Sequence, residues 1–318
     1  MTNVVLTEPL ALPLFERMRA MFPSSVVFGM VPTRLDDDFA RHVAAAEVLL
    51  VGHHKIGADT LKLAPNVRFV QRAGVGYDNL DVAALRSAGV AAAYTPGANS
   101  SAVAEHTIML MLALLKRLPA AEQATRAGGW PTGELIQAGI GDLRGATVGL
   151  IGLGTIGKEV AKRLAPFGAR IVYTTRHRLD EVAEKQLCVT YAPLHELLET
   201  STIISLHVPL NGSTSGLIGE AELTAMRPGA VLVNTSRGEV VDEAALRRAI
   251  ESGHLAGAAL DVLQHEGDGT NSFVDLPQVI ITPHIAGASR LGALRIMEMA
   301  AENIARFVNG ETPLNLIP

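Results

Sequence analysis

The sequence predicts an α/β protein with two doubly wound parallel sheets, and three observations support this fold class. Short β-branched runs alternate with helical stretches along the whole chain, an order typical of parallel sheets covered by helices on both faces. The length of 318 residues suggests about two domains. Hydrophobic residues make up 48% and charged residues 19%, an ordinary globular mix that excludes a disordered chain, a collagen-like repeat and a coiled coil.

Strands and helices are expected in alternation along the first part of the chain. The runs expected as strands cover residues 25–30, 47–52, 67–71 and 90–94. The stretches expected as helices cover residues 10–21, 36–45 and 81–87.

A second series of strands begins near the middle of the chain. Because ligands of such sheets bind at the carboxyl ends of the strands, polar residues that follow these strands are the candidate site residues. The expected strands cover residues 146–152, 170–174, 188–191, 202–206, 230–234, 257–261 and 278–282.

A helix expected over residues 102–118 is apolar nearly all round and must therefore be buried. Burial in the core of its own domain is one explanation, and a contact between two copies of the chain is the other. Trp130 follows this helix, and its size argues against an exposed position.

The charge and the single cysteine exclude several classes of protein. A formal net charge of −5 argues against a nucleic-acid-binding protein, which usually has a concentrated basic face. The apolar runs are far shorter than the ~20 residues of a membrane span, and the N-terminus lacks the basic start of a signal peptide. Cys188 lies in an apolar run and is expected to be a buried structural thiol in a reducing cytoplasm. No spacing of ligand residues predicts a metal site.

The sharpest local signal is a G-x-G-x-x-G pattern formed by Gly152, Gly154 and Gly157, between an expected strand and a helix expected at 158–166. Gly152 permits a tight turn, Gly154 lets a pyrophosphate approach the backbone, and Gly157 lets the helix lie close to the strand. The N-terminus of the helix then offers free N–H groups to the anion. The pattern predicts dinucleotide binding, and a purely structural turn is the alternative.

The next strand ends without the acidic residue that usually holds the ribose of NAD. Thr174, Thr175 and Arg176 stand there instead. The guanidinium of Arg176 suits a 2′-phosphate, which favours NADP(H) as the cofactor, with NAD(H) as the second candidate. The alternative is a solvated basic loop beside loosely bound NAD(H).

Arg237, Glu266 and His284 each follow the carboxyl end of an expected strand. Histidine removes the proton of a hydroxyl group as a hydride leaves the carbon, and an adjacent carboxylate stabilises the imidazolium. Arginine binds a substrate carboxylate with paired donors. The trio therefore fits the oxidation of an alcohol beside a carboxylate. Three unrelated loop residues are the alternative, because strand ends carry many polar side chains.

Six motifs together resemble the D-isomer-specific 2-hydroxyacid dehydrogenase family over essentially the whole chain. They cover residues 74–81, 103–105, 152–157, 205–209, 234–238 and 283–284. The resemblance implies a Rossmann cofactor domain at 99–289 and a flavodoxin-like substrate domain at 1–98 and 290–318, with a cleft between them. It implies an NAD(P)-dependent oxidoreductase acting on CH–OH donors, which reduces a small 2-oxo acid such as glyoxylate or hydroxypyruvate.

The resemblance also implies roles for single residues. Arg237, Glu266 and His284 correspond to the catalytic set, and Arg237 and His284 bind substrate together with the backbone amides of Val75 and Gly76. Glu266 is followed by glycine rather than by the proline common in the family, so its loop is expected to be more mobile. Residues 100–103 resemble a loop beside the nicotinamide. The cofactor residues implied beside the three glycines and the loop at Arg176 are Thr155, Ile156, Val208, Pro209, Thr214, Thr235, Ser236, Asp261 and Gly287.

The other histidines are open to two interpretations. His53 and His54 follow an expected strand and either contact substrate or lie on the surface. His207 is expected to pack or to contact the cofactor, and His265 to point away from the proton relay. His106 is expected to be an ordinary surface or packing residue.

The assembly and the function class also have alternatives. In the family the helix matching 102–118 lies at a dimer contact, which implies a homodimer. A dinucleotide-sensing, corepressor-like interaction protein is the second functional hypothesis, and a methyltransferase with the same glycine loop is the third. Turnover of 2-oxo acids would separate the first hypothesis from the others.

Overall fold

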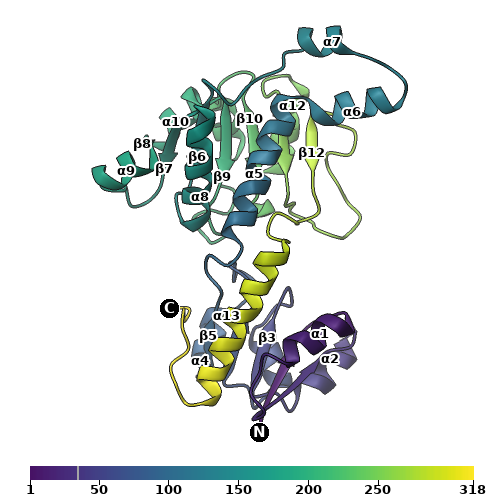
Figure 1. The fold of residues 1–318 in the computed structure, drawn as a ribbon, viewed down its shortest axis with the longest axis vertical. Coiled ribbons are helices and arrows are strands. Elements are labelled where there is room, and N and C mark those ends of the chain that lie inside the picture. Colours follow the sequence, from purple (N-terminus) through teal and green to yellow (C-terminus); the bar gives the residue numbers. More distant parts are fainter. Residues whose placement is uncertain (34–35) are drawn as a thin grey trace. The chain divides into compact units, whose positions relative to one another are not determined.

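The computed structural model describes residues 1–33 and 36–318, which form two compact units (Figure 1). Unit 1 comprises Met1–Asn99 and Ser289–Pro318, and unit 2 comprises Ser100–Ala288. Each unit contains a parallel sheet with helices on both faces, so the predicted α/β class is confirmed. Within the described ranges, no helix is long and apolar enough to span a membrane.

The sheet of unit 1 has the strand order β2-β1-β3-β4-β5, which is the flavodoxin-like order. Strand β1, which lies between β2 and β3, was not predicted, because its apolar run Val4–Leu6 is short. The strands are β1 (Thr2–Leu6), β2 (Val26–Met30), β3 (Val48–Val51), β4 (Phe69–Arg72) and β5 (Ala91–Ala93).

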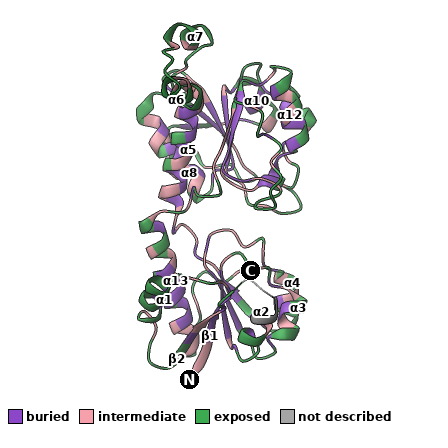
Figure 2. Ribbon diagram, turned by 90° about the vertical axis from the view of Figure 1, so that its right-hand side faces the viewer, coloured by how far each residue is buried: buried purple, intermediate pink, exposed green. Residues whose placement is uncertain are grey.

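Helices cover both faces of this sheet, and Figure 2 shows their buried sides turned toward the strands. One face carries α1 and α13, whose Phe15, Met18 and Ile304 belong to one core cluster, and the other carries α2, α3 and α4. Helix α3 was not predicted, since six residues give little periodicity. The bounds are α1 (Leu12–Arg19), α2 (Asp36–Val43), α3 (Ala58–Leu63), α4 (Val82–Ser87) and α13 (Arg290–Val308).

The sheet of unit 2 has the order β12-β11-β10-β9-β6-β7-β8. The chain starts at β6, moves outward through β7 and β8, and returns to place β9 on the other side of β6. This reversal is the switch point at which doubly wound sheets bind ligands. The strands are β6 (Thr147–Ile151), β7 (Arg170–Thr174), β8 (Val189–Tyr191), β9 (Ile203–Leu206), β10 (Val231–Asn234), β11 (Gly257–Leu260) and β12 (Val279–Ile281).

Helix α5 (Ser100–Leu115) packs on one face of this sheet together with α8 (Thr155–Leu164). Its side chains Ile108, Leu110 and Met111 are buried in the core of unit 2. The apolar character of α5 is therefore explained mostly by burial in its own domain. The remaining helices are α9 (Glu181–Leu187), α10 (Leu194–Thr200), α11 (Glu220–Ala225) and α12 (Glu243–Glu251).

Helices α6 (Leu118–Arg126) and α7 (Thr132–Gln137) extend away from the sheet of unit 2 (Figure 1). Trp130, between them, is 83% exposed, so the expectation that its size would bury it is wrong within one chain. The α6–α7 segment contains no buried residue in either helix, so it offers Trp130 no core to enter.

Cys188 is exposed, which corrects the expectation of a buried thiol. It forms the C-cap of α9 with φ of +54°, and the buried residue Val189 follows it at the start of β8. The apolar run that contains Cys188 is thus divided between a helix end and a strand.

Candidate active site

The glycine-rich loop joins β6 to α8. Gly152 has φ of +94°, and a Cβ atom there would lie 2.4 Å from the carbonyl oxygen of His207. A Cβ atom on Gly157 would lie 2.5 Å from the carbonyl oxygen of Gly152. Both positions therefore require glycine, because the helix and the end of the neighbouring strand approach the loop closely.

Gly154 leaves open space instead. A Cβ atom there would meet no atom within 4 Å, and Gly154 is the N-cap of α8. The open space therefore adjoins the free N–H groups of the first helical turn, which includes Thr155 and Ile156. Backbone donors, the positive end of the helix and this space together fit the diphosphate of a dinucleotide.

We expect Gly154→Ala to weaken dinucleotide binding without unfolding the chain. The added methyl group meets nothing in the chain, so the free energy of unfolding should change by less than about 1 kcal/mol. The same methyl group blocks close approach of a diphosphate, so the Kd for NADPH in a fluorescence titration should rise at least about tenfold. Gly152→Ala is the contrasting variant and should lose stability as well. An unchanged Kd for Gly154→Ala would place the diphosphate elsewhere.

Two arginines follow the end of β7, and they differ in their contacts. Arg178 donates to the Glu184 carboxylate at 2.8 and 3.1 Å and lies over the ring of Tyr191, 5.3 Å from its centroid. The hydrogen bond from Arg178 also holds the pKa of Glu184 below its ordinary value. Among the described residues, no hydrogen bond or ion pair engages Arg176, which is exposed after Thr174 and Thr175. Asp180, the next acidic residue, serves as the N-cap of α9.

The other predicted cofactor residues lie in loops after the strands of the same sheet. Thr214 uses its hydroxyl within its own loop, donating to the carbonyl of Pro209 at 2.6 Å. The remaining residues are Val208 after β9, Thr235 and Ser236 after β10, Asp261 after β11 and Gly287 after β12.

Asn234, buried at the end of β10, shapes the turn that carries Arg237. Its Oδ1 accepts hydrogen bonds from the backbone N–H and the hydroxyl of Ser236 at 3.0 and 2.8 Å, and its Nδ2 donates to the carbonyl of Arg237 at 2.8 Å. A Cβ atom on Gly238 would lie 2.0 Å from the carbonyl carbon of Leu263. The turn after β10 is therefore packed against the segment that leads to Glu266.

Glu266 and His284 form a direct pair, with Oε2 of the carboxylate 2.7 Å from Nδ1 of the imidazole. Partial burial raises the pKa of the Glu266 carboxyl, but the hydrogen bond and charge of His284, aided by Arg237, outweigh it and hold the pKa below its ordinary value. An ionised carboxylate stabilises an imidazolium beside it. The structure thus brings the three predicted side chains into one neighbourhood of unit 2.

The loop that carries Glu266 is fastened at both ends. Gln264 donates its backbone N–H to the Glu243 carboxylate at 2.6 Å. At the far end, Arg247 donates to both oxygens of Asp275 at 2.8 and 2.6 Å, which lowers the pKa of Asp275 to about 2. These contacts fix the two ends of the loop, and the mobility expected from the glycines that follow Glu266 stays a prediction.

Asp261 organises the turn on which His284 lies. Asp261 is 1% exposed, and its carboxylate accepts the backbone N–H groups of Ile285 and Ala286 at 2.9 and 2.8 Å. Its own carbonyl accepts the N–H of His284 at 2.8 Å. His284 has φ of +53°, a left-handed conformation that costs about 1–2 kcal/mol for a residue with a side chain. The three hydrogen bonds hold this conformation and so direct the imidazole.

Comparison with known proteins identifies the family. Residues 108–286, more than half of the chain, match the model of the D-isomer specific 2-hydroxyacid dehydrogenase, NAD binding domain. The chain belongs to the D-isomer specific 2-hydroxyacid dehydrogenase family.

Individual members of the family agree with this assignment. A glyoxylate reductase of Aeropyrum pernix is 41% identical over 284 residues, which cover 87% of this chain and 84% of the relative. A glyoxylate reductase structure from Paecilomyes thermophila has a TM-score of 0.88 at 29% identity and covers 100% and 98% of the two chains. The D-lactate dehydrogenase of Aquifex aeolicus, complexed with NAD and lactic acid, has a TM-score of 0.86 at 27% identity and covers 98% and 96%.

The dehydrogenase is therefore an NAD(P)-dependent oxidoreductase that uses a nicotinamide dinucleotide as cofactor. The comparisons give no support to a corepressor-like interaction protein or a methyltransferase, because the relatives above are named as reductases and dehydrogenases.

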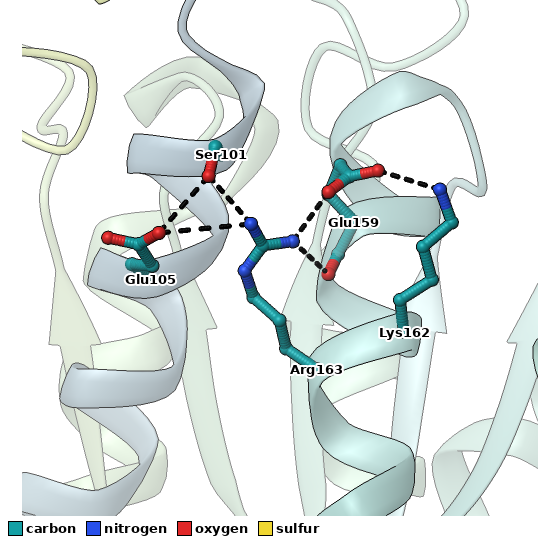
Figure 3. Close-up of polar contacts among 5 residues, drawn as sticks. All are labelled: Ser101, Glu105, Glu159, Lys162 and Arg163. Carbon is teal, nitrogen blue, oxygen red and sulfur yellow. Dashed lines mark hydrogen bonds and ion pairs between the residues drawn. The ribbon is translucent and has the colours of Figure 1, made fainter. Parts of the chain in front are cut away.

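Residues 100–103 of the dehydrogenase form the first turn of α5 rather than a loop. Figure 3 shows how this turn is held: Arg163 donates from Nη2 to the Ser101 hydroxyl at 2.6 Å, and that hydroxyl donates to Glu105 at 3.1 Å. Arg163 also donates to the Glu159 carboxylate at 2.5 Å. Because Glu159 and Arg163 belong to α8, the start of α5 is tied to the helix that follows the glycine loop.

Val75 and Gly76 lie in a loop of unit 1 that follows β4. The buried Arg72, at the end of β4, donates from Nε to Asn79 Oδ1 at 3.1 Å. Asn79 donates in turn to two carbonyls after β3 at 3.1 and 2.8 Å. The loop is thereby held at the carboxyl ends of two central strands, where sheets of this kind bind ligands.

The histidines after β3 are held through their backbone. The carboxylate of Glu8 accepts the N–H groups of both His53 and His54, the latter at 2.9 Å. The ring of His54 stacks on Phe39 with centroids 3.9 Å apart. Packing thus explains His54, while the role of His53 stays a prediction.

His207 and His265, which were not expected to take part in proton transfer, have other partners. Nε2 of His207 lies 3.0 Å from the Ser205 hydroxyl, and burial lowers the pKa of His207 to about 4. A neutral imidazole below the glycine loop suits packing rather than proton transfer. His265 is exposed, with Nδ1 3.8 Å from the carboxylate of Asp268.

Two residues of α5 that sequence reasoning had missed contact the strand ends of the site. Nε2 of His106 lies 3.1 Å from the hydroxyl of Thr282, and the hydroxyl of Thr107 lies 3.0 Å from that of Thr235. The available signal was a pair of polar residues inside an otherwise apolar helix.

Proposed function

We propose that the dehydrogenase is an NADPH-preferring reductase of small 2-oxo acids such as glyoxylate or hydroxypyruvate. The observation that carries the proposal is the His284–Glu266 pair, at 2.7 Å, on the same edge of the sheet as the glycine loop and Arg237. The glyoxylate reductases among its relatives support the substrate class. Unit 2 is proposed as the cofactor domain and unit 1 as the substrate domain.

A nicotinamide dinucleotide bound at the glycine loop would supply the hydride that reduces the carbonyl carbon of the substrate. The Nδ1–H group of His284 donates a hydrogen bond to the Glu266 carboxylate. Nε2 is therefore the nitrogen that transfers a proton to the carbonyl oxygen of the substrate. Glu266 stabilises the imidazolium before the transfer. Arg237 presents paired donors to the substrate carboxylate. Val75 and Gly76 remain predicted substrate-binding residues of unit 1.

A matrix of NADPH and NADH against glyoxylate, hydroxypyruvate, pyruvate and phenylpyruvate tests the proposal. We expect the highest kcat/KM for glyoxylate and hydroxypyruvate, with NADPH as the cofactor. Absence of turnover on all four acids would contradict the proposed function. Faster turnover of phenylpyruvate than of glyoxylate would contradict the substrate class alone.

Arg176→Ala should raise the KM for NADPH about tenfold or more, because a hydrogen bond to a charged group contributes about 1.5–3 kcal/mol. The KM for NADH should stay within about twofold, since NADH lacks the 2′-phosphate. His177→Ala is the matched control on the same exposed loop and should change neither value. Equal use of NADPH and NADH by the unmodified enzyme would contradict the role of Arg176.

We also propose that the enzyme is a homodimer. Most apolar side chains of α5 are buried in unit 2 itself, so we place the contact at the segment that follows it. Leu118, Trp130 and Ile136 are 55%, 83% and 66% exposed on this segment. A cavity of about 600 Å³ adjoins it, lined partly by Ile140 and by Ile280 of β12. A second copy covering the segment would bury these side chains.

Trp130 is the only tryptophan, so its fluorescence reports on this contact directly. The emission should shift to shorter wavelength as protein concentration rises, and the double variant Trp130→Ser with Ile136→Ser should sediment as a monomer. Val182→Ser, at an equally exposed valine of α9, should leave the assembly unchanged. A monomer at micromolar concentration for the unmodified chain would contradict the dimer.

We further propose that the enzyme works in the cytoplasm. Its single cysteine, Cys188, is an exposed free thiol, a state that a reducing compartment maintains. Alkylation of thiols in intact cells should find Cys188 reduced, and recovery of an oxidised form would contradict this location.

A further inference from the structure

We propose that His106 is a positioning residue for His284: it fixes Thr282 against Asp261, and Asp261 holds the turn that directs the catalytic imidazole. The inference deepens the proposed function and rests on the role of His284 as the acid of the reaction. The three groups come from different elements, since His106 lies on α5, Asp261 follows β11 and Thr282 follows β12.

The contacts form a compact chain of side chains. The hydroxyl oxygen of Thr282 lies 2.5 Å from Oδ1 of Asp261, and Nε2 of His106 lies 3.1 Å from the same hydroxyl oxygen. Nε2 of His106 is also 3.5 Å from Oδ1 of Asp261. The side chains of His106 and Asp261 are only 12% and 1% exposed, so water competes little for these contacts.

Counting protons gives the direction of each hydrogen bond. The carboxylate of Asp261 only accepts, and its oxygens already receive two backbone N–H groups, so the single proton of the Thr282 hydroxyl points to Oδ1. The oxygen of Thr282 must then accept from His106. His106 therefore carries its proton on Nε2, and it acts here as a donor rather than as a base.

The consequence reaches His284 through the backbone. Oδ1 of Asp261 is shared between the Thr282 hydroxyl and the N–H of Ile285, so the position of one donor affects the other. Those hydrogen bonds hold His284 in its left-handed conformation, with φ of +53°. Loss of the His106 donor frees the Thr282 hydroxyl to turn away, which leaves the turn intact but less well directed.

A merely structural histidine and a positioning histidine predict different kinetics. If His106 only fills space, its removal lowers stability and leaves the kcat of the folded enzyme unchanged. If His106 positions the acid, kcat falls while the KM for substrate and the KM for NADPH change little, because Asp261 and His284 stay in place and only the direction of the imidazole is less well fixed.

The first test measures kcat and both KM values for glyoxylate and NADPH. His106→Leu and Thr282→Val should each lower kcat about tenfold, the effect of one lost hydrogen bond, with both KM values within about twofold. The double variant should be no worse than about twofold below either single variant, because both remove the same link. His106→Gln keeps an N–H donor and should recover kcat to within about threefold of the unmodified enzyme. His195→Leu, an exposed histidine on α10, is the control.

The second test does not depend on turnover. Amide hydrogen exchange of Ile285 and Ala286 should be at least about tenfold faster in His106→Leu and Thr282→Val than in the unmodified enzyme and His195→Leu. Unchanged exchange at both amides, or an unchanged kcat in His106→Leu, overturns the proposal. If the unmodified enzyme turns over no 2-oxo acid, the proposed function fails, and the exchange rates alone decide whether His106 holds the turn.

Discussion

Replacing His284 by alanine is expected to lower the kcat for 2-oxo acid reduction at least about 10³-fold, because a positioned acid contributes about 10²–10⁴-fold and the pair with Glu266 is lost as well. The Kd for NADPH should stay within about threefold, since the glycine loop lies after other strands of the sheet. Steady-state kinetics and a cofactor titration on the same sample measure both quantities.

Glu266→Gln separates charge from hydrogen bonding in this pair. The amide oxygen still accepts the Nδ1 proton of His284, but it no longer stabilises the imidazolium, so kcat should fall by about 10²-fold and less than in His284→Ala. His265→Ala, next to Glu266 but exposed and in contact with Asp268, is the matched control and should retain full turnover. A His284→Ala enzyme with more than a tenth of normal kcat would contradict the assigned role.

Gly238→Ala is expected to destabilise the dehydrogenase by at least about 3 kcal/mol, because the new Cβ atom would lie 2.0 Å from the Leu263 carbonyl carbon and 2.3 Å from the Gln264 nitrogen. Both neighbours are backbone atoms, so no side chain can rotate to relieve the overlap. The ends of β10 and β11 must separate, which moves Arg237 and Glu266 apart. Thermal unfolding and kcat should therefore fall together.

The control for this substitution is Gly133→Ala in α7. A Cβ atom there meets nothing within 4 Å, and alanine favours helix more than glycine does. Its Tm should be unchanged or slightly higher. A Gly238→Ala protein as stable as the Gly133→Ala protein would show that the two strand ends do not pack as described.

Much of the fold could be predicted because turn-forming residues in the sequence mark where most strands and helices begin and end. The strand predicted at 170–174 is β7 at the same residues, and the other predicted strands fall within two residues at each end. β1 and α3 were missed, since short elements give too few residues for a pattern. Trp130 and Cys188 were misjudged because burial depends on neighbours brought by the tertiary fold, which residue type alone does not supply.

The candidate site divides in the same way. Arg237, Glu266 and His284 were predictable because each follows the carboxyl end of a parallel strand, and such ends share one edge of the sheet. The contact of His106 with Thr282 joins residues 176 positions apart, and no local pattern marks it. The positive φ of His284 and the use of Asp261 as its support also depend on tertiary hydrogen bonds.

The contacts of Arg178 have a consequence for how easily the neighbouring position 176 can be changed. Glu184 neutralises the guanidinium of Arg178, and the ring of Tyr191 covers it. These contacts of α9 and β8 therefore do not depend on which residue stands at position 176. A substitution at Arg176 therefore removes one positive charge from this loop without a compensating change in the fold. If Arg176 binds the 2′-phosphate as proposed, a change of preference between NADPH and NADH needs few substitutions.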